Sequence, residues 1–486
     1  MTSLALAWRR FFRTDLYPSE DLPLFITKAS LELMDSTDFF CVFLLSDIKS
    51  SLNRGQIFLA RIYAEIYIYL TLMLKIFGRY KQYRSASFKN AVNSGKGNIV
   101  MELCSEHNLK RCILEASDVT SAQIKYDSNV LYYSNNDIVE DFIVISQPDN
   151  DYPIQKKHGD LIHLRNFPHL RGRDLSILKA FMIRSILATS MIKVMEENKY
   201  TWTHLPVLTT NDCEGGGECF HVSSPSPSSK ILSTNCFLTV STQLHAEAAV
   251  VPFKKIFSFS PIFRAENSQT TRHLNEFWML EAEEANLSSI SELMNSVETF
   301  LRQSARLAMT ELNRNPLMED IVEKLSQLNA AHYFRFEIEE LSLFYACFLK
   351  KGILFQKTTL SKEDEKWVCG VLKSPVFVKG FPLSHKPFYM MSDGNKTESF
   401  DLLLPDVGEV VGGGLRESNY LQIISNLKQK QVSLEKMSWY ADLRRYGYSY
   451  SGGYGLGFER LLLYVLGVDN IKDVIFAPRA PGLVLL

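Results

Sequence analysis

The sequence predicts an α+β protein whose main domain is an antiparallel sheet flanked by helices. From residue 200 onward, strand-like runs such as CFLTVSTQL and FWMLEAE alternate with helical ones such as ISELMNSVETFLRQSARLAMTEL. Before them lies LSILKAFMIRSILATSMIKVMEEN, whose apolar residues recur at helical spacing. Between residues 97 and 148, four short strand-like runs are separated by polar turns, which favours a small, degenerate or partial β-barrel.

The composition is that of an ordinary folded protein. The chain has 486 residues, enough for two or three domains, with 46% hydrophobic and 22% charged residues. A formal net charge of −1 excludes a uniformly basic nucleic-acid coat but leaves room for a local basic face. The eight cysteines include no CxxC pair and no cluster at zinc spacing. We therefore expect free thiols in a reducing compartment and no structural metal site.

The N-terminal residues are basic and apolar. Arg9, Arg10 and Arg13 all precede the first acidic residue, Asp15, and apolar residues interleave them. This pattern is typical of a mitochondrial transit segment. Residues 1–20 are therefore predicted to direct the chain to the mitochondrial matrix, with a cytoplasmic location as the alternative.

Residues 21–95 are predicted to be a separate region, in part a helical insertion. Their most apolar window, residues 56–77, has nearly the length of a membrane span, but Arg61, Glu65 and Lys75 interrupt it. A buried helix is the favoured interpretation of this window, and no membrane partner is expected.

The stretch FRAENSQTTRHLNEFWMLEAE, residues 263–283, concentrates opposed charges in a pattern typical of a β-hairpin. A hairpin would bring Arg264, Glu266, Arg272, His273 and Phe277 into one neighbourhood. An arginine fork suits phosphate, and a phenylalanine face can stack on a purine. The alternative is an exposed hairpin with paired surface charges, each contributing little.

Two glycine-containing stretches carry further candidates. SGGYGLGFERLLLYVLGVDN, residues 451–470, allows close backbone approach and places Arg460 beside an apolar run, where it needs an anionic partner. Its glycine spacing does not match a Rossmann fingerprint. FDLLLPDVGEVVGGGLRE, residues 400–417, offers Asp401 and Glu409 as magnesium ligands and Arg416 for a polar substrate; a charged ribbon with a glycine bulge is the alternative.

TNDCEGGGECF and TVSTQLHAEAA present carboxylates and amides beside small residues. Glu214, Gln243 and Glu247 could bind an ammonium or an amide, although a lone glutamate is more often a surface residue. These two stretches carry weight only in combination with the others.

Together the stretches resemble the class II aminoacyl-tRNA synthetases of the aspartyl/asparaginyl subgroup. Residues 263–283 look like motif 2 and GGYGLGFERLLLYVLGVDNIKDV looks like motif 3. The run ending in YTWTHLPVLTT, with Pro206, looks like the dimer-forming motif 1. The resemblance covers residues 151–486 as a catalytic domain and implies a homodimer. It also implies that residues 96–150 are an OB-like anticodon-binding domain, incomplete because its opening strand is not recognisable.

For ATP, the resemblance implies that Arg264 holds the α-phosphate and that His273 and Arg460 hold the γ-phosphate. Phe277 would stack on adenine, with Arg272 in the same pocket. Glu266 would lie near the adenine and the tRNA acceptor end, and Asp401 and Glu409 would hold Mg²⁺ against the phosphates. The expected catalytic set is Arg264, Glu266, His273 and Arg460.

For the amino acid, the resemblance implies that Glu214 receives the α-ammonium, Gln243 helps to hold the substrate and adenylate, and Arg416 faces its side-chain end. Aspartyl members typically carry a lysine in the segment QLfKQ, whereas this chain has QLHAE, with Ala246 and Glu247. Loss of that cation disfavours aspartate and favours asparagine.

The expected function is ATP-dependent ligation of L-asparagine to tRNA(Asn) through an aminoacyl-adenylate. The alternatives are ligation of aspartate to tRNA, a tRNA-independent adenylating paralogue, and a non-catalytic relative. The chain departs from the family at Ser451, where a histidine is usual before the motif 3 glycines, and at IFAPR near the C-terminus.

Overall fold

The computed structural model describes five strands between residues 84 and 146, and then residues 148–154, 161–210, 219–223, 236–312, 318–349 and 359–483. The expected transit segment at residues 1–20, the apolar window 56–77 and Glu214 lie outside the described residues.

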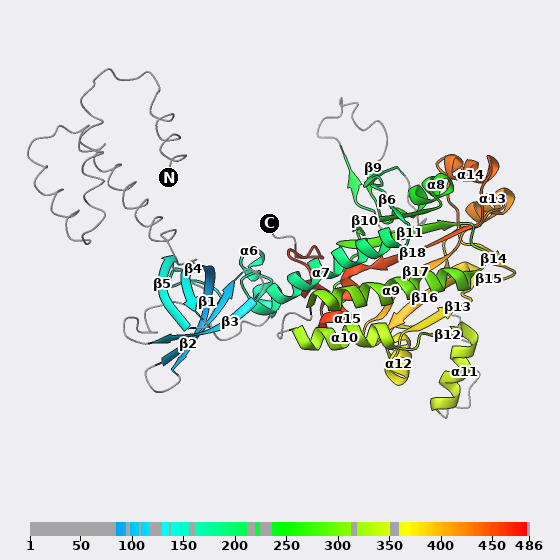
Figure 1. The fold of residues 1–486 in the computed structure, drawn as a ribbon. Helices are drawn as coiled ribbons and strands as arrows, with labels where there is room; N and C mark the ends of the chain where they lie inside the picture. Colours follow the sequence, from blue (N-terminus) through cyan, green and yellow to red (C-terminus); the bar gives the residue numbers. More distant parts are fainter. Residues whose placement is uncertain are drawn as a thin grey trace, which may run out of the picture. The chain divides into compact units, whose positions relative to one another are not determined.

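The five N-terminal strands form a closed barrel in the order β1-β2-β3-β5-β4, with β1 paired to both β2 and β4 (Figure 1). The sequence predicted an incomplete barrel beginning at residue 96, but β1 precedes that residue and closes the barrel. The strand RSASFKNAVN was missed because it is largely polar and has a bulge between Phe88 and Asn90, which weakens its alternation. The barrel strands are β1 Arg84–Asn93, β2 Asn98–Ser105, β3 Asn108–Glu115, β4 Asn129–Asn135 and β5 Ile138–Ser146.

The main domain is built on an eight-stranded sheet in the order β12-β13-β16-β17-β18-β11-β10-β6 (Figure 1). Its six inner strands pair antiparallel, and each edge strand pairs in parallel with its neighbour. This confirms the predicted α+β class and its largely antiparallel sheet. The strands are β6 Thr201–Trp202, β10 Lys255–Phe263, β11 Glu276–Ala285, β12 Phe334–Glu337, β13 Val376–Lys379, β16 Ser399–Leu404, β17 Gly408–Leu415 and β18 Ser451–Gly457.

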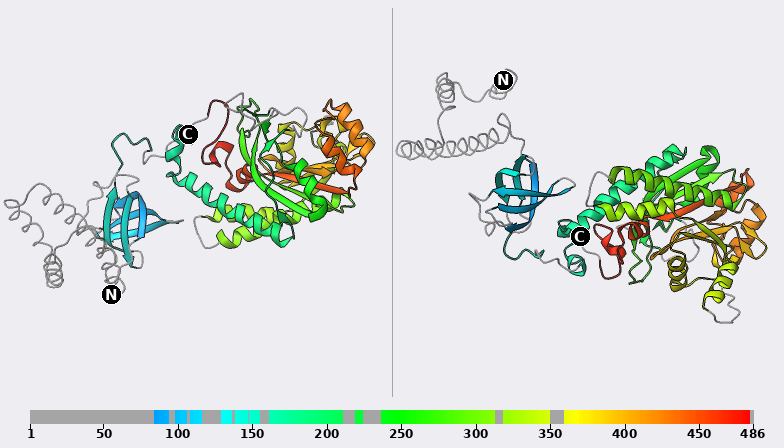
Figure 2. Two further views of the ribbon diagram at one scale, coloured as in Figure 1. Left: turned by 90° about the horizontal axis from the view of Figure 1, so that it is seen from above. Right: turned by 60° about the horizontal axis from the view of Figure 1, so that its bottom comes forward.

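Long helices cover one face of this sheet (Figures 1 and 2). Apolar residues of the helices and strands meet in one core, which includes Leu187, Val297, Leu325, Leu402 and Leu461. Burial of these side chains packs the inner strands against the helices and stabilises their positions. The helices on this side are α7 Leu175–Glu197, α9 Ile290–Leu312, α10 Glu319–Ala330 and α15 Phe458–Leu466.

A second apolar cluster joins α8, α13 and α14, with Leu244, Ile423 and Tyr440 among its buried members. The cluster places these three helices side by side at one end of the sheet (Figure 1). These helices are α8 Gln243–Phe253, α13 Tyr420–Gln429 and α14 Ser438–Arg445.

The remaining elements are short or lie at the edges. They are α5 Leu161–Leu164, α6 Pro168–Arg171, β7 Leu208–Thr209, β8 His221–Val222, β9 Cys236–Leu238, α11 Ile338–Leu349, α12 Lys362–Leu372, η4 Leu383–His385, β14 Ser392–Asp393, β15 Lys396–Thr397 and η5 Ile471–Asp473. Of these, α12 matters for function, because it begins with a capping box between Ser361 and Asp364 and lies against β16 and β17.

Helix α7 is long and apolar enough to cross a membrane, judged by length and composition alone. A core helix of a soluble protein passes the same test, and here Ile183, Leu187 and Met191 are buried in the main core. The expectation of no membrane partner stays a prediction.

Candidate active site

Strands β10 and β11 form the hairpin that the sequence predicted, with Phe263 opposite Glu276. Arg264 follows β10 directly, and its backbone N–H donates to the Asn275 carbonyl at 3.0 Å. The Asn275 amide donates to the carbonyls of Arg264 at 2.7 Å and Glu266 at 3.1 Å. These bonds close the base of the connecting loop, so the charged side chains start from a fixed backbone.

An open cleft of about 700 Å³, including the space at its mouth, lies beside this hairpin. The structure brings together all seven residues that the sequence assigned to ATP, since each lines the cleft. The Arg264 guanidinium lies over the Phe277 ring at 5.7 Å, so a planar cation and an aromatic face share one wall. The seven are Arg264, Glu266, Arg272, His273, Phe277, Glu409 and Arg460.

His273 is held by two hydroxyl groups of its own loop. Its Nδ1 lies 3.0 Å from Ser268 Oγ and 2.5 Å from Thr270 Oγ1. Burial, with the nearby cations Lys362 and Arg460, lowers the pKa of His273 below its ordinary value. The ring is therefore expected to be neutral near pH 7 and to contact a phosphate as a hydrogen-bond donor.

Asp401 on β16 and Glu409 on β17 converge beside Gly412. A Cβ built on Gly412 would lie 3.3 Å from Glu409 Oε1 and 3.5 Å from Asp401 Oδ1. Lys386 donates to both oxygens of Asp401 at 2.8 and 3.0 Å, and Arg460 donates to Glu409 Oε2 at 3.2 Å. Each carboxylate is thus paired with one cation, and of these four groups Glu409 and Arg460 line the cleft.

These neighbours act differently on the two carboxyl groups. Burial raises the pKa of Asp401 above its ordinary value, although Lys386 opposes the shift. Burial also favours the neutral form of Glu409, but Arg460 and Lys386 outweigh it and lower the pKa of Glu409. No group of three or more His, Cys, Asp and Glu side chains that could hold a metal occurs among the described residues. An ion here would take its other ligands from water or substrate.

Glu365, on α12, is a residue of this site that the sequence did not single out. Its Oε2 accepts the backbone N–H of Glu409 at 3.1 Å. Burial raises the pKa of Glu365, and the carboxylates of Glu409 and Asp401 add to the shift. Gly408, at φ 85°, lies beside the side chains of Glu365 and Arg272, where a Cβ would collide with the Glu365 carboxylate. No signal near residue 365 points to the site, because the contact depends on how α12 packs.

At the other end of the site, Arg416 follows β17 and pairs with Glu283 on β11. Arg416 Nε donates to Glu283 Oε2 at 3.2 Å and Nη2 donates to Oε1, with both side chains buried. Burial raises the pKa of Glu283 to about 7, although Arg416 opposes the shift. The carboxylate extends over Gly453 of β18, where any Cβ would collide with it, which explains one glycine of the SGGYG run.

Comparisons with known proteins agree with this geometry. Residues 162–481 match the family model described as tRNA synthetases class II (D, K and N). The chain belongs to this family. It is 38% identical over 352 residues to the asparagine–tRNA ligase of Mycoplasma mobile, which covers 70% of this chain and 78% of that protein. It is 36% identical over 363 residues to that of Malacoplasma penetrans, covering 71% and 79%.

Solved structures resemble the chain in fold. Asparaginyl-tRNA synthetase from Pyrococcus horikoshii, complexed with asparaginyl-adenylate, has a TM-score of 0.73 at 24% identity, covering 84% of this chain and 96% of that one. The enzyme from Entamoeba histolytica, in complex with the same adenylate, has a TM-score of 0.71 at 23% identity, covering 84% and 98%. These two likenesses establish the class II synthetase fold.

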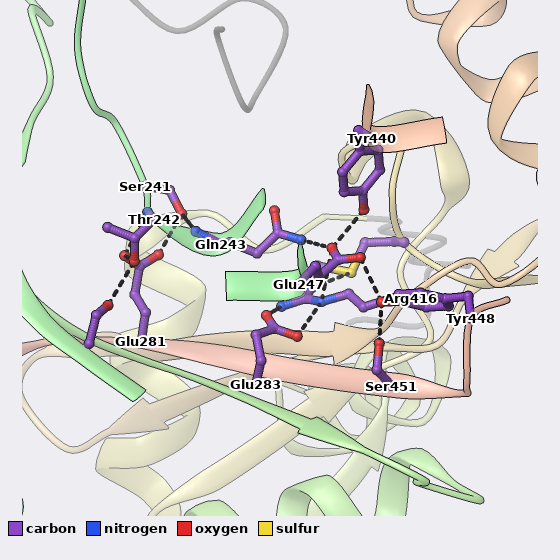
Figure 3. A network of polar contacts seen from close by, with 12 residues as sticks. Ser241, Thr242, Gln243, Glu247, Glu281, Glu283, Arg416, Tyr440, Tyr448 and Ser451 are labelled. Atoms are coloured by element: carbon purple, nitrogen blue, oxygen red, sulfur yellow. Dashed lines mark hydrogen bonds and ion pairs between the residues drawn. The ribbon is translucent and has the colours of Figure 1, made fainter. Parts of the chain in front are cut away.

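In this synthetase fold, Gln243, Ala246 and Glu247 all lie on α8 and are buried. Glu247 has no exposed surface and accepts hydrogen bonds from four side chains, of which Gln243, Tyr440 and Tyr448 are labelled in Figure 3. Three of these donors come from α14 and the segment after it, which the sequence analysis did not single out. They are Tyr440 at 2.6 Å, Arg444 at 2.6 Å and Tyr448 at 2.8 Å; the fourth is Gln243.

Glu281 is a second residue that was missed. Its carboxylate accepts from Ser241 Oγ, from the backbone N–H of Thr242 at 2.8 Å and from Thr242 Oγ1 at 2.5 Å (Figure 3). These bonds fix the turn from which α8 starts, so Gln243 enters the site at a defined angle. Ser451, in place of the usual histidine, is buried, and its hydroxyl contacts that of Tyr448.

Proposed function

We propose that the chain ligates L-asparagine to tRNA(Asn), using ATP to form an asparaginyl-adenylate first. The observation that carries the choice of amino acid is the identity of residues 246 and 247 on α8. A buried alanine and a buried carboxylate stand where aspartyl members of the subgroup have a lysine. The names of the relatives, asparagine–tRNA ligases at 36–38% identity, support the same assignment.

The first chemical step is in-line attack of the asparagine carboxylate on the α-phosphorus of ATP, with pyrophosphate as the leaving group. Such a reaction needs positioning and charge stabilisation rather than a nucleophilic side chain. Arg264, which follows β10 in the hairpin, would hold the α-phosphate. His273 and Arg460, which line the same cleft, would hold the leaving pyrophosphate, and Phe277 would hold adenine between itself and Arg460.

The amino-acid end combines buried carboxylates with buried donors, among which Arg416 is the one assigned to the substrate. The Arg416 guanidinium suits the side-chain carbonyl of asparagine, and a buried acceptor such as Gln243 Oε1 suits its NH₂ group. An aspartate would bring a third carboxylate next to Glu247 and Glu283. A buried charge without a partner costs several kcal/mol, on the order of the penalty that discriminates between isosteric substrates.

Asp401 and Glu409 fit Mg²⁺ as hard oxygen ligands that face one another across Gly412. Bound there with ATP, the ion would neutralise phosphate charge. Lys386 forms an ion pair with Asp401 and Arg460 forms one with Glu409.

We also propose a homodimer and a mitochondrial location. The dimer is supported by the exposed apolar side chains Trp202, Leu208 and Phe253 near the motif 1 segment. The location is supported only by the composition of residues 1–20. The five-stranded barrel would bind the anticodon, since closed five-stranded barrels of this kind are common oligonucleotide binders.

Charging of tRNA tests the whole reaction. Purified protein incubated with ATP, Mg²⁺, tRNA and radiolabelled asparagine is expected to give acid-precipitable label. Adenylate formation without any transfer to tRNA would instead support a tRNA-independent adenylating paralogue. Transfer of aspartate in preference to asparagine would contradict the assignment based on Ala246.

A further inference from the structure

Glu247 is saturated by donors of the protein itself. Oε1 accepts from Gln243 Nε2 and from Tyr440 at 2.6 Å, and Oε2 accepts from Arg444 at 2.6 Å and from Tyr448 at 2.8 Å. A carboxylate offers about four acceptor positions, so all of them are taken. Arg416 Nε lies 3.8 Å away, beyond hydrogen-bond distance. Glu247 therefore acts on the substrate mainly through the groups that it orients.

The group that it orients toward the substrate is the amide of Gln243. A carboxylate can only accept, so Gln243 must present Nε2 to Glu247 and turn Oε1 away (Figure 3). Gln243 is 6% exposed, and Oε1 is a buried acceptor with no hydrogen-bond partner among the described residues. Such an atom is suited to receive an N–H from a ligand. If the Gln243 amide rotated, its NH₂ group would take the place of Oε1 and would suit the side-chain carboxylate of aspartate instead.

Tyr448 connects this amide-orienting glutamate to the opposite wall of the site. Its ring stacks on the Arg444 guanidinium at 4.2 Å, and its hydroxyl lies between Glu247 and Ser451 Oγ. The Ser451 carbonyl in turn accepts the backbone N–H of Arg416 at 2.8 Å. Tyr448 and Ser451 thus tie the Glu247 network to the strand end that carries Arg416.

We propose that Tyr448 is a positioning residue for amino-acid selection. Held by Ser451, it keeps the Glu247 carboxylate in the plane that pins Gln243 Nε2 and presents Gln243 Oε1 to the NH₂ of a carboxamide side chain. Ser451, which is buried, supplies the hydroxyl that contacts Tyr448. This inference rests on the proposed function, because it assumes that asparagine binds beside Gln243.

The test is ATP–pyrophosphate exchange by the full chain with asparagine and with aspartate, varying each substrate. Tyr448→Phe keeps the ring on Arg444 and removes only the hydroxyl. It is expected to raise KM for asparagine about tenfold and to lower the asparagine-to-aspartate ratio of kcat/KM by a similar factor, with KM for ATP within about twofold. Ser451→Ala removes the hydroxyl that holds Tyr448. It is expected to raise KM for asparagine and to lower the asparagine-to-aspartate ratio of kcat/KM, each by about threefold.

Tyr450→Phe is the matched control, because Tyr450 is 62% exposed and outside the network; it should change neither quantity. Unchanged asparagine KM and selectivity in both Tyr448→Phe and Ser451→Ala would overturn the proposal, as would equal rises in KM for ATP and asparagine. If Tyr448→Phe does not fold, Ser451→Ala decides alone. The unmodified chain is measured before any variant. If it shows no asparagine-dependent exchange, the proposed function itself is overturned, and this outcome is separate from the effect of the variants.

Discussion

The Arg416 guanidinium donates to both carboxylate oxygens of Glu283, a residue 133 positions away on a different strand. The side chains of both residues are almost fully buried, at 3% and 2% exposure. Because Gly453 leaves room for the carboxylate, the pair forms across β18, near the ends of β11 and β17. It fixes the position of the Arg416 guanidinium, which the proposed function assigns to the substrate side chain.

Glu283→Gln tests the ionisation of this pair through stability. Burial raises the pKa of Glu283 from 4.5 to about 7, so the folded protein binds a proton that the unfolded chain releases between these values. Stability from this group is therefore present at low pH and is lost as pH rises toward 7. From pH 5 to pH 8, the unfolding free energy of the unmodified protein should fall by about 2 kcal/mol relative to Glu283→Gln. Urea unfolding at each pH measures this free energy for both proteins. If it changes with pH equally in both, the raised pKa of Glu283 is contradicted.

Arg460→Lys tests recognition of the nucleotide. Arg460 reaches both the backbone carbonyl of Glu409 at 3.1 Å and its carboxylate at 3.2 Å, and it lines the cleft. Lysine retains the charge but loses the planar fork, so kcat/KM for ATP in exchange should fall roughly 100-fold. Arg445→Lys, at a residue whose side chain is 59% exposed, should have no effect. Equal activity of the two variants would show that Arg460 does not bind the nucleotide.

Asp401→Asn tests the magnesium assignment. The Mg²⁺ concentration that gives half-maximal exchange should rise about tenfold, because one anionic oxygen ligand becomes a neutral amide. KM for asparagine should change little, since the proposal assigns Asp401 to the ion that binds the phosphates. Asp393→Asn, at an exposed residue of β14, is the control. A magnesium dependence identical to that of the unmodified protein would rule out Asp401 as a ligand.

Glu365 allows a test of backbone support for the same site. Glu365→Leu removes the acceptor for the Glu409 N–H and should raise KM for ATP about tenfold. Glu365→Gln retains an acceptor oxygen and should raise it only about threefold. Glu363→Gln, at an exposed residue two positions earlier in α12, provides the comparison. If Leu and Gln have the same effect at residue 365, the backbone hydrogen bond is not the contact that matters.

The residues of the cleft were predictable because the stretches that carry them together resemble the motifs of class II synthetases; the hairpin alone was equally compatible with paired surface charges. The hairpin at 263–283 follows from strand alternation around a polar connection, and the pairing of Phe263 with Glu276 brings the charged loop together as expected. The glycines of β17 and β18 also signalled close packing before any contact was known. The antiparallel sheet was predictable because strand-like runs mix with helical runs from residue 200 onward, which is typical of an α+β domain.

The interior of the amino-acid site was not predictable in the same way. Glu247 and Arg444 are 197 residues apart, and nothing near either one indicates that they are partners. Glu365 reaches Glu409 only because α12 packs on β17. Strand β1 was missed because polar residues and a bulge hide its alternation. In each case the decisive contact is long-range, and local composition favours an ordinary surface.

The most direct test of the account is ATP–pyrophosphate exchange with asparagine and aspartate side by side. The buried pair Ala246 and Glu247, without a lysine, predicts exchange with asparagine and a kcat/KM for aspartate lower by at least about 100-fold. Ala246→Lys should narrow that difference by adding a cation that can pair with the side-chain carboxylate of aspartate. Exchange that runs with aspartate and not with asparagine would contradict the central claim.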